Sequence, residues 1–122
     1  MHSAPHVVVC DHEPHVNRIL ALKLERAGYE VHTTTNPTTA HDMIERTHPT
    51  LVIAEECIAQ QDGGALLAQI RALSAACLLL TDHTPSDEEQ CLPVDGVFQK
   101  PFSPRQLVAK ATSLASTEPV LA

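Results

Sequence analysis

The chain has 122 residues, of which 43% are hydrophobic, and its fifteen acidic side chains outnumber eight Lys and Arg to give a net charge of −7. This length is typical of one domain. Both halves are acidic, and one Tyr, two Phe and no Trp are too few for a base-stacking surface, which argues against a nucleic-acid partner. No apolar run reaches the roughly 18–20 residues of a membrane helix, and the N-terminus lacks signal-peptide character, so we expect no membrane partner and a cytoplasmic location.

Five short segments predict strands, because they are apolar or rich in β-branched residues. They cover residues 6–10, 30–34, 51–54, 77–81 and 96–98. Most are nearly all apolar, as in strands that helices cover on both faces. The second is more polar, which places it at an edge of the sheet.

Helices are predicted between these strands from proline and glycine signals and from apolar spacing. The first begins at Pro14 and stops at Gly28, the second begins after Asn36, and the last begins at Pro104. The Asp62-Gly63-Gly64 run breaks the chain before a third helix. The expected buried residues are Val16, Ile19, Leu20, Leu24, Ala27, Ala40, Met43, Ile44, Leu66, Leu67, Ile70, Leu73, Leu107, Val108, Ala111 and Leu114.

The segment 82–95 departs from this alternation. It holds Pro85 and Pro93, and the second proline would end a full helix early. We therefore expect only a short helical turn within 86–92.

Strands that alternate with helices indicate a parallel sheet with helices on both faces, and functional groups then lie beyond the carboxyl ends of the strands. The residues at those ends are Asp11, His12, Glu55, Glu56, Thr81, Asp82, Lys100 and Pro101.

These residues, in this order, resemble the receiver domain of bacterial response regulators, the CheY-like family, from about Val7 to Ser116. The matching segments are 7–14, 22–31, 51–55, 62–63, 79–81 and 100–102. The resemblance implies a flavodoxin-like (βα)5 three-layer sandwich with strand order 2-1-3-4-5 and a shortened fourth helix. It also implies a single receiver domain over 1–122, with a core of about 6–116 and a loose tail at 117–122.

The resemblance also assigns roles. A typical receiver binds Mg²⁺ through an acidic pair and the aspartate that accepts the phosphoryl group, which a Thr and a Lys contact. Here Asp11 keeps the first acidic position and Thr81 and Lys100 are intact, but His12 replaces the second acidic residue. Glu55 stands at the acceptor position.

Val97 stands where the family has its aromatic switch residue, so the usual coupling of Thr to an aromatic ring lacks one half. Mg²⁺ prefers oxygen ligands in a near-octahedral array, so an imidazole at His12 and a longer carboxylate at Glu55 predict a weak or absent site on Asp11 and Glu55.

We therefore expect a receiver of two-component signalling that acts as a protein-interaction module without normal phosphorylation, and not as an enzyme. Glu55 either mimics a phosphorylated state, by bonding to Lys100 or Thr81, or locks the domain. The expected partners are a histidine kinase, a phosphotransfer protein or an output protein. A homodimer through the last-helix face, 103–116, is also possible on this pattern.

Two alternatives stay open. The chain could still bind Mg²⁺ and be phosphorylated in an ordinary phosphorelay. It could instead sense a metal or redox state through Cys10, His12 and Cys57, although Cys10, Cys57, Cys77 and Cys91 form no CxxC pair and are expected to be free thiols. The other histidines share no spacing, and most are expected to be solvated.

Overall fold

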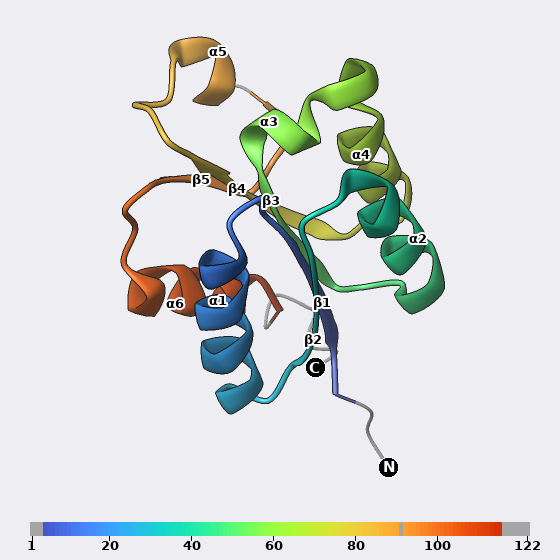
Figure 1. The fold of residues 1–122 in the computed structure, drawn as a ribbon, viewed down its shortest axis with the longest axis vertical. Helices are drawn as coiled ribbons and strands as arrows, with labels where there is room; N and C mark the ends of the chain where they lie inside the picture. Colours follow the sequence, from blue (N-terminus) through green and yellow to red (C-terminus); the bar gives the residue numbers. More distant parts are fainter. Residues whose placement is uncertain (1–3, 91, 116–122) are drawn as a thin grey trace, which may run out of the picture.

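The computed structural model describes residues 4–90 and 92–115. Its centre is a five-stranded parallel sheet of order β2-β1-β3-β4-β5 (Figure 1). The strands are β1 (His6–Cys10), β2 (Glu30–Thr34), β3 (Leu51–Glu55), β4 (Ala76–Thr81) and β5 (Gly96–Gln99). The predicted (βα)5 architecture and strand order are confirmed, and β2 lies at an edge as its composition indicates.

Helices cover both faces of this sheet, which gives three layers (Figure 1). The helices are α1 (Pro14–Arg26), α2 (Pro37–Thr47), α3 (Glu56–Ala59), α4 (Gln61–Ala72), α5 (Asp87–Gln90) and α6 (Pro104–Ala115). Helices α1 and α6 lie on one face, and α2, α3 and α4 lie on the other. The four-residue α5 confirms the shortened helix before β5. None of the described helices is both long and apolar enough to cross a membrane.

The core is divided by the sheet into two clusters. Along β1, Val7 and Val9 face the α1/α6 side, whereas Val8 and Cys10 face the α2/α4 side, and all four are fully buried. Side chains alternate between the faces of a strand, so an almost wholly apolar strand is what a sheet covered on both sides requires.

Local signals set the helix ends. The Asn36 side chain caps α2 by accepting hydrogen bonds from the backbone N–H of Thr38 and Thr39. Gly28, with φ of +102°, follows α1. The N–H of Gly28 donates to the Glu25 carbonyl and that of Tyr29 to the Leu24 carbonyl, which is a Schellman motif.

Several details differ from the sequence prediction. Ile19 is 40% exposed on α1, and Ala27 and Leu73 (36% exposed) are the C-cap residues of α1 and α4, so none of the three is a core residue. The short helix α3 was not predicted from the sequence. Helix α4 begins at Gln61, before the predicted break at Gly63 and Gly64. Because both glycines have positive φ, regular right-handed helix geometry starts only after them. The expected tail 117–122, the core boundary at 116, and Cys91 lie outside the described residues.

Candidate functional site

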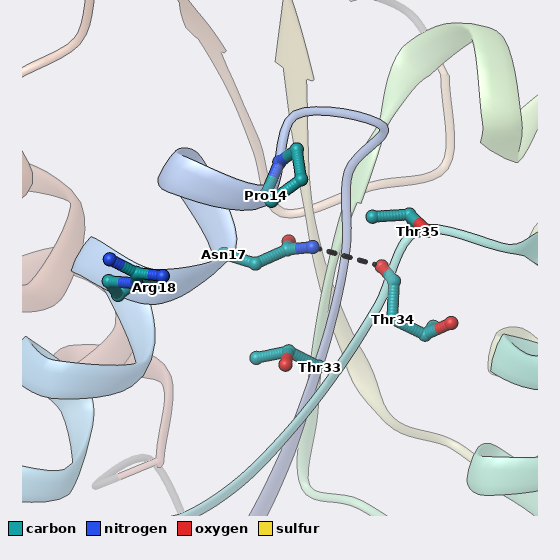
Figure 2. A pocket seen from close by; sticks show the side chains of 6 residues that line it. All are labelled: Pro14, Asn17, Arg18, Thr33, Thr34 and Thr35. Carbon is teal, nitrogen blue, oxygen red and sulfur yellow. Dashed lines mark hydrogen bonds between the residues drawn. The ribbon is translucent and has the colours of Figure 1, made fainter.

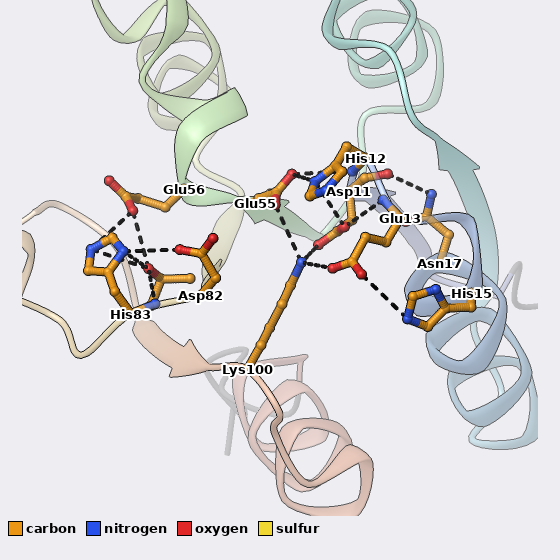
Figure 3. Close-up of polar contacts among 11 residues, drawn as sticks. Asp11, His12, Glu13, His15, Asn17, Glu55, Glu56, Asp82, His83 and Lys100 are labelled. Carbon is orange, nitrogen blue, oxygen red and sulfur yellow. Dashed lines mark hydrogen bonds and ion pairs between the residues drawn. The ribbon is translucent and has the colours of Figure 1, made fainter.

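Four elements bring polar side chains together at the carboxyl edge of the sheet. Asp11 follows β1, Glu55 ends β3, Thr81 ends β4, and Lys100 follows β5. Asp11, Glu55 and Thr81 are at most 5% exposed. The structure thus places the predicted residues at one edge of the sheet, and Figure 3 shows the contacts of Asp11, Glu55 and Lys100.

Lys100 is the cation at the centre of this region. Its Nζ lies 2.7 Å from Asp11 Oδ2, 2.8 Å from Glu13 Oε1 and 3.4 Å from Glu55 Oε2 (Figure 3). Burial alone would lower the pKa of Lys100, but its hydrogen bonds to Asp11 and Glu13 outweigh burial and raise that pKa. The hydrogen bond from Lys100 in turn lowers the pKa of Glu13. The ammonium group therefore stays charged and ties three carboxylates together.

His12 binds the carboxylate at the acceptor position. Its Nδ1 lies 2.6 Å from Glu55 Oε1, and its backbone N–H donates to the same oxygen at 3.2 Å. The hydrogen bond and charge of Glu55 raise the pKa of His12. Burial would raise the pKa of Glu55, but the two hydrogen bonds from His12 and the charge of Lys100 lower it. The arrangement favours a charged pair of imidazolium and carboxylate.

Asp11 is held by contacts that sequence reasoning did not identify. The Glu13 backbone N–H donates to Asp11 Oδ1 at 2.9 Å. Asn17 donates through Nδ2 to the carbonyl oxygens of Asp11, at 3.0 Å, and of Thr34, at 3.1 Å. Figure 2 shows Asn17 reaching from α1 to the end of β2, in a pocket of about 430 Å³. Asn17 therefore fixes the loop that carries Asp11.

Thr81 contacts a second group of residues. Its Oγ1 lies 3.3 Å from Glu56 Oε2 and 3.0 Å from His83 Nδ1. His83 also approaches Asp82, with Nδ1 3.2 Å from Oδ1. Of the two contacts that the sequence suggested for Glu55 in the mimicry role, the structure has the one to Lys100, whereas the described contacts of the Thr81 hydroxyl go to Glu56 and His83.

Glu13, Asn17 and His83 are the residues that the sequence did not single out for this region. Glu56 was expected at the end of its strand, but spacing did not indicate that it meets Thr81 and His83. Val97, the switch-equivalent position, lies on β5 opposite Leu79 and packs against the α2/α4 cluster.

The two cysteines of the alternative metal or redox site do not join the ligand cluster. Among the described residues, the candidate metal-ligating atoms that converge here belong to Asp11, His12 and Glu55. Burial raises the pKa of the Cys10 thiol to about 12, and burial and Glu55 raise that of Cys57. Reactive and metal-binding cysteines need an accessible thiolate, so this environment does not favour either role.

The donor set is a poor fit to Mg²⁺. One of the three converging ligands is an imidazole nitrogen, whereas Mg²⁺ requires oxygens at about 2.0–2.1 Å. The Lys100 ammonium already lies against both carboxylates of the set, Asp11 and Glu55. A divalent cation would therefore meet a fixed positive charge beside its ligands.

The sequence model of the response regulator receiver domain matches residues 7–112, and the chain belongs to this family. It is 30% identical over 111 residues to the phosphate regulon transcriptional regulatory protein PhoB of Pseudomonas aeruginosa, covering 85% of this chain and 48% of that protein. It is 29% identical over 112 residues to the probable transcriptional regulator ycf27 of Cyanophora paradoxa, covering 88% and 47%. The chain thus spans about half the length of these curated relatives.

Solved structures share the fold. A response regulator from Thermotoga maritima superposes with a TM-score of 0.81 at 19% identity, covering 94% of this chain and all of that one. The chemotaxis protein CheY4 of Vibrio cholerae gives 0.78 at 21% identity, covering 92% and 99%. The molecule is therefore a CheY-like receiver domain, the kind of domain that works in two-component signalling and generally is not an enzyme.

Proposed function

We propose that this receiver domain acts as a protein-interaction module without normal acceptor phosphorylation. The observation that carries the proposal is that Glu55, at the acceptor position, is engaged at both oxygens: Oε1 by His12 at 2.6 Å and Oε2 by Lys100 at 3.4 Å. A nucleophile in phosphoryl transfer must be positioned in line with the phosphorus, and small displacements are costly. Both oxygens of Glu55 instead serve an internal ion-pair network.

The same network also supplies the positive charge that a divalent cation would bring to the carboxylates. Lys100 and His12 place positive charge beside Asp11 and Glu55, the two carboxylates that would hold Mg²⁺. Metal binding here would have to separate these pairs inside a largely buried site. We therefore propose that Mg²⁺ binds weakly or not at all.

Of the two roles open to Glu55, locking is better supported than mimicry. The contact between Glu55 and Lys100 fits both roles. A mimic of the phosphorylated state should also draw the Thr81 hydroxyl toward the acceptor side chain, but the described contacts of that hydroxyl are with Glu56 and His83. Glu also carries one negative charge, whereas a phosphoryl group carries up to two. Val97 supplies no aromatic ring to follow a movement of Thr81.

We further propose that a protein partner docks beside α1. Ile19 and Leu22 on this helix are 40% and 46% exposed. Ile19 also lines a groove of about 400 Å³ between α1 and the start of α6, together with Phe102 and Pro104. Pro104 is the first residue of α6 and belongs to the last-helix face, 103–116, expected from the sequence. A monomer in light scattering at high concentration would rule out the homodimer and leave a kinase, phosphotransfer or output protein as the partner.

Phosphorylation with acetyl phosphate and Mg²⁺, followed by intact mass, tests the proposal. The wild-type chain should gain no phosphoryl group, and neither should the single variant Glu55→Asp, in which His12 remains. The double variant His12→Asp with Glu55→Asp should become labelled, which also shows that the fold and Thr81 and Lys100 are competent. A labelled wild-type chain would overturn the proposal in favour of an ordinary phosphorelay receiver.

A further inference from the structure

Three potential metal ligands meet at the opposite end of the sheet from Asp11 and Glu55. His6 begins β1, and Glu30 and His32 lie on β2. In the parallel register His6 pairs with Glu30, and His32 is two residues further along β2. Side chains two apart in a strand share a face, so the register itself brings the three side chains together.

The donor atoms form a small triangle. His6 Nδ1 lies 2.9 Å from His32 Nε2, and Glu30 Oε2 lies 3.4 Å from the first nitrogen and 3.5 Å from the second. For a tetrahedral Zn²⁺ with bonds of about 2.0–2.1 Å, neighbouring ligand atoms are about 3.3 Å apart. The two nitrogens would therefore need to separate by only a few tenths of an ångström to accept the ion.

We propose that His6, Glu30 and His32 form a site for a divalent transition metal of the zinc type. Two imidazoles and one carboxylate are a known zinc ligand set that leaves a fourth position open. The two rings are half-buried, at 32% and 26% side-chain exposure, and Glu30 is 58% exposed, so solvent can supply the fourth ligand. The site shares no residue with the acceptor region (Asp11, His12, Glu55 and Lys100), and the proposal does not depend on whether Glu55 is phosphorylated.

Backbone contacts hold these ligands in place. The carbonyl of His6 accepts from the Thr50 backbone N–H at 2.9 Å, and the Glu30 N–H donates to the Pro5 carbonyl at 2.9 Å. The imidazole rings are nearly parallel, with an interplanar angle of 14° and centroids 5.2 Å apart. A bound ion would join β1 to the edge strand β2, so it should also stabilise the fold.

Zinc titration of the tag-free chain, by calorimetry and by amide NMR, tests the site. We use a Cys57→Ser, Cys91→Ser background so that these thiols do not compete. One equivalent of Zn²⁺ should bind, with shifts at the start of β1 and in β2, and the melting temperature should rise. Replacing a residue that only hydrogen-bonds to a metal ligand typically weakens metal binding about 10–100-fold. Loss of a direct ligand should cost at least as much, so His6→Gln and His32→Gln should each weaken Zn²⁺ binding at least tenfold.

Two matched variants locate the binding. His12→Gln removes the imidazole of the acceptor region, and His15→Gln removes a histidine whose side chain is 77% exposed and which belongs to neither cluster. Both should bind Zn²⁺ within about twofold of the parent. Loss of binding in His12→Gln, unchanged binding in His32→Gln, or no saturable binding at submillimolar Zn²⁺ would overturn the proposal. If a histidine variant fails to fold, Glu30→Gln removes the third ligand instead and should also weaken Zn²⁺ binding.

Discussion

The His12 ring and the Glu55 carboxylate form a hydrogen bond of 2.6 Å between Nδ1 and Oε1. The resemblance to receivers assigns carboxylates to both of these positions. The His12 imidazolium instead brings a positive charge to the carboxylate at the acceptor position. Lys100 brings a second positive charge to the other oxygen of Glu55, at 3.4 Å from Oε2.

Replacing Glu55 with Gln should lower the pKa of His12. In the wild-type chain the hydrogen bond to Glu55 and its charge raise that pKa, and the amide of Gln carries no charge. Histidine-detected NMR titration of the two chains measures the shift. An unchanged pKa of His12 in Glu55→Gln would contradict the ion pair between His12 and Glu55.

The pair also predicts how stability depends on pH. Folding raises the pKa of His12 above its ordinary 6.5, so its contribution is complete below that value and is lost as the pH rises through the folded pKa. Folding lowers the pKa of Glu55 below 4.5, so its contribution is present above 4.5 and is lost as the pH falls through the folded pKa.

The difference in melting temperature between the wild-type chain and His12→Gln should consequently be largest between pH 4.5 and 6.5. It should shrink toward alkaline pH. Thermal unfolding followed by circular dichroism across this range provides the test, and a difference that grows with pH would refute it.

Lys100→Gln should destabilise the fold strongly. It removes the cation from three carboxylates, and two of them, Asp11 and Glu55, are almost fully buried. Removing one partner of a buried ion pair costs about 3–5 kcal/mol, and we expect about 3 kcal/mol because Glu13 is partly exposed. Urea unfolding measures the difference.

Lys23→Gln is the matched control, because Lys23 is exposed in the last turn of α1. An exposed substitution of this kind changes the free energy of unfolding by about 0.5 kcal/mol or less. Equal losses for Lys23→Gln and Lys100→Gln would mean that the network around Lys100 adds nothing to stability.

The described cysteines should differ in accessibility. Cys57 is exposed, whereas Cys10 and Cys77 are buried, and burial raises the pKa of each buried thiol to about 12. Iodoacetamide should therefore modify Cys57 in the native protein, slowly because its pKa is also raised, and reach the other two only in denaturant. Peptide mass spectrometry identifies the sites. Rapid alkylation of Cys10 in the folded protein would support the alternative of a redox sensor.

Gly28→Ala should destabilise the chain by about 1 kcal/mol. Gly28 has φ of +102°, and a side chain in left-handed backbone costs roughly 1–2 kcal/mol even though nothing lies within 4 Å of the added carbon. Gly28→Asn, which tolerates positive φ better, should lose less. If Ala proved as stable as Gly at this position, the Schellman ending of α1 would not matter to stability.

The fold could be predicted because its signals are local. The stop at Gly28 and the cap at Asn36 depend on residues within one helical turn, and both occur as expected. Ile19 misled the prediction, since its helical spacing fits a buried face but the width of the covered face depends on how closely α6 packs. Spacing alone does not contain that information.

Part of the site could be predicted from the sequence, but not how its side chains pair. Asp11, Glu55 and Lys100 lie at the ends of strands that must meet at one edge of the sheet, so their proximity follows from the topology. Side-chain rotamers decide which carboxylate oxygens Lys100 reaches. They also decide that Thr81 contacts Glu56. His6 and His32 lie 26 positions apart with no shared motif, and only the β1–β2 register reveals that they touch.

An amide NMR titration with Mg²⁺ and then beryllofluoride, an acyl phosphate mimic, tests whether the acceptor pocket can still bind these ligands. We expect no saturable shifts at Asp11, Glu55, Thr81 or Lys100 in the wild-type chain at millimolar Mg²⁺. The chain with His12→Asp and Glu55→Asp should show them, which controls for folding and for the reagent. Saturable shifts at these four residues in the wild-type chain would contradict the claim that the pocket is closed by its own ion pairs.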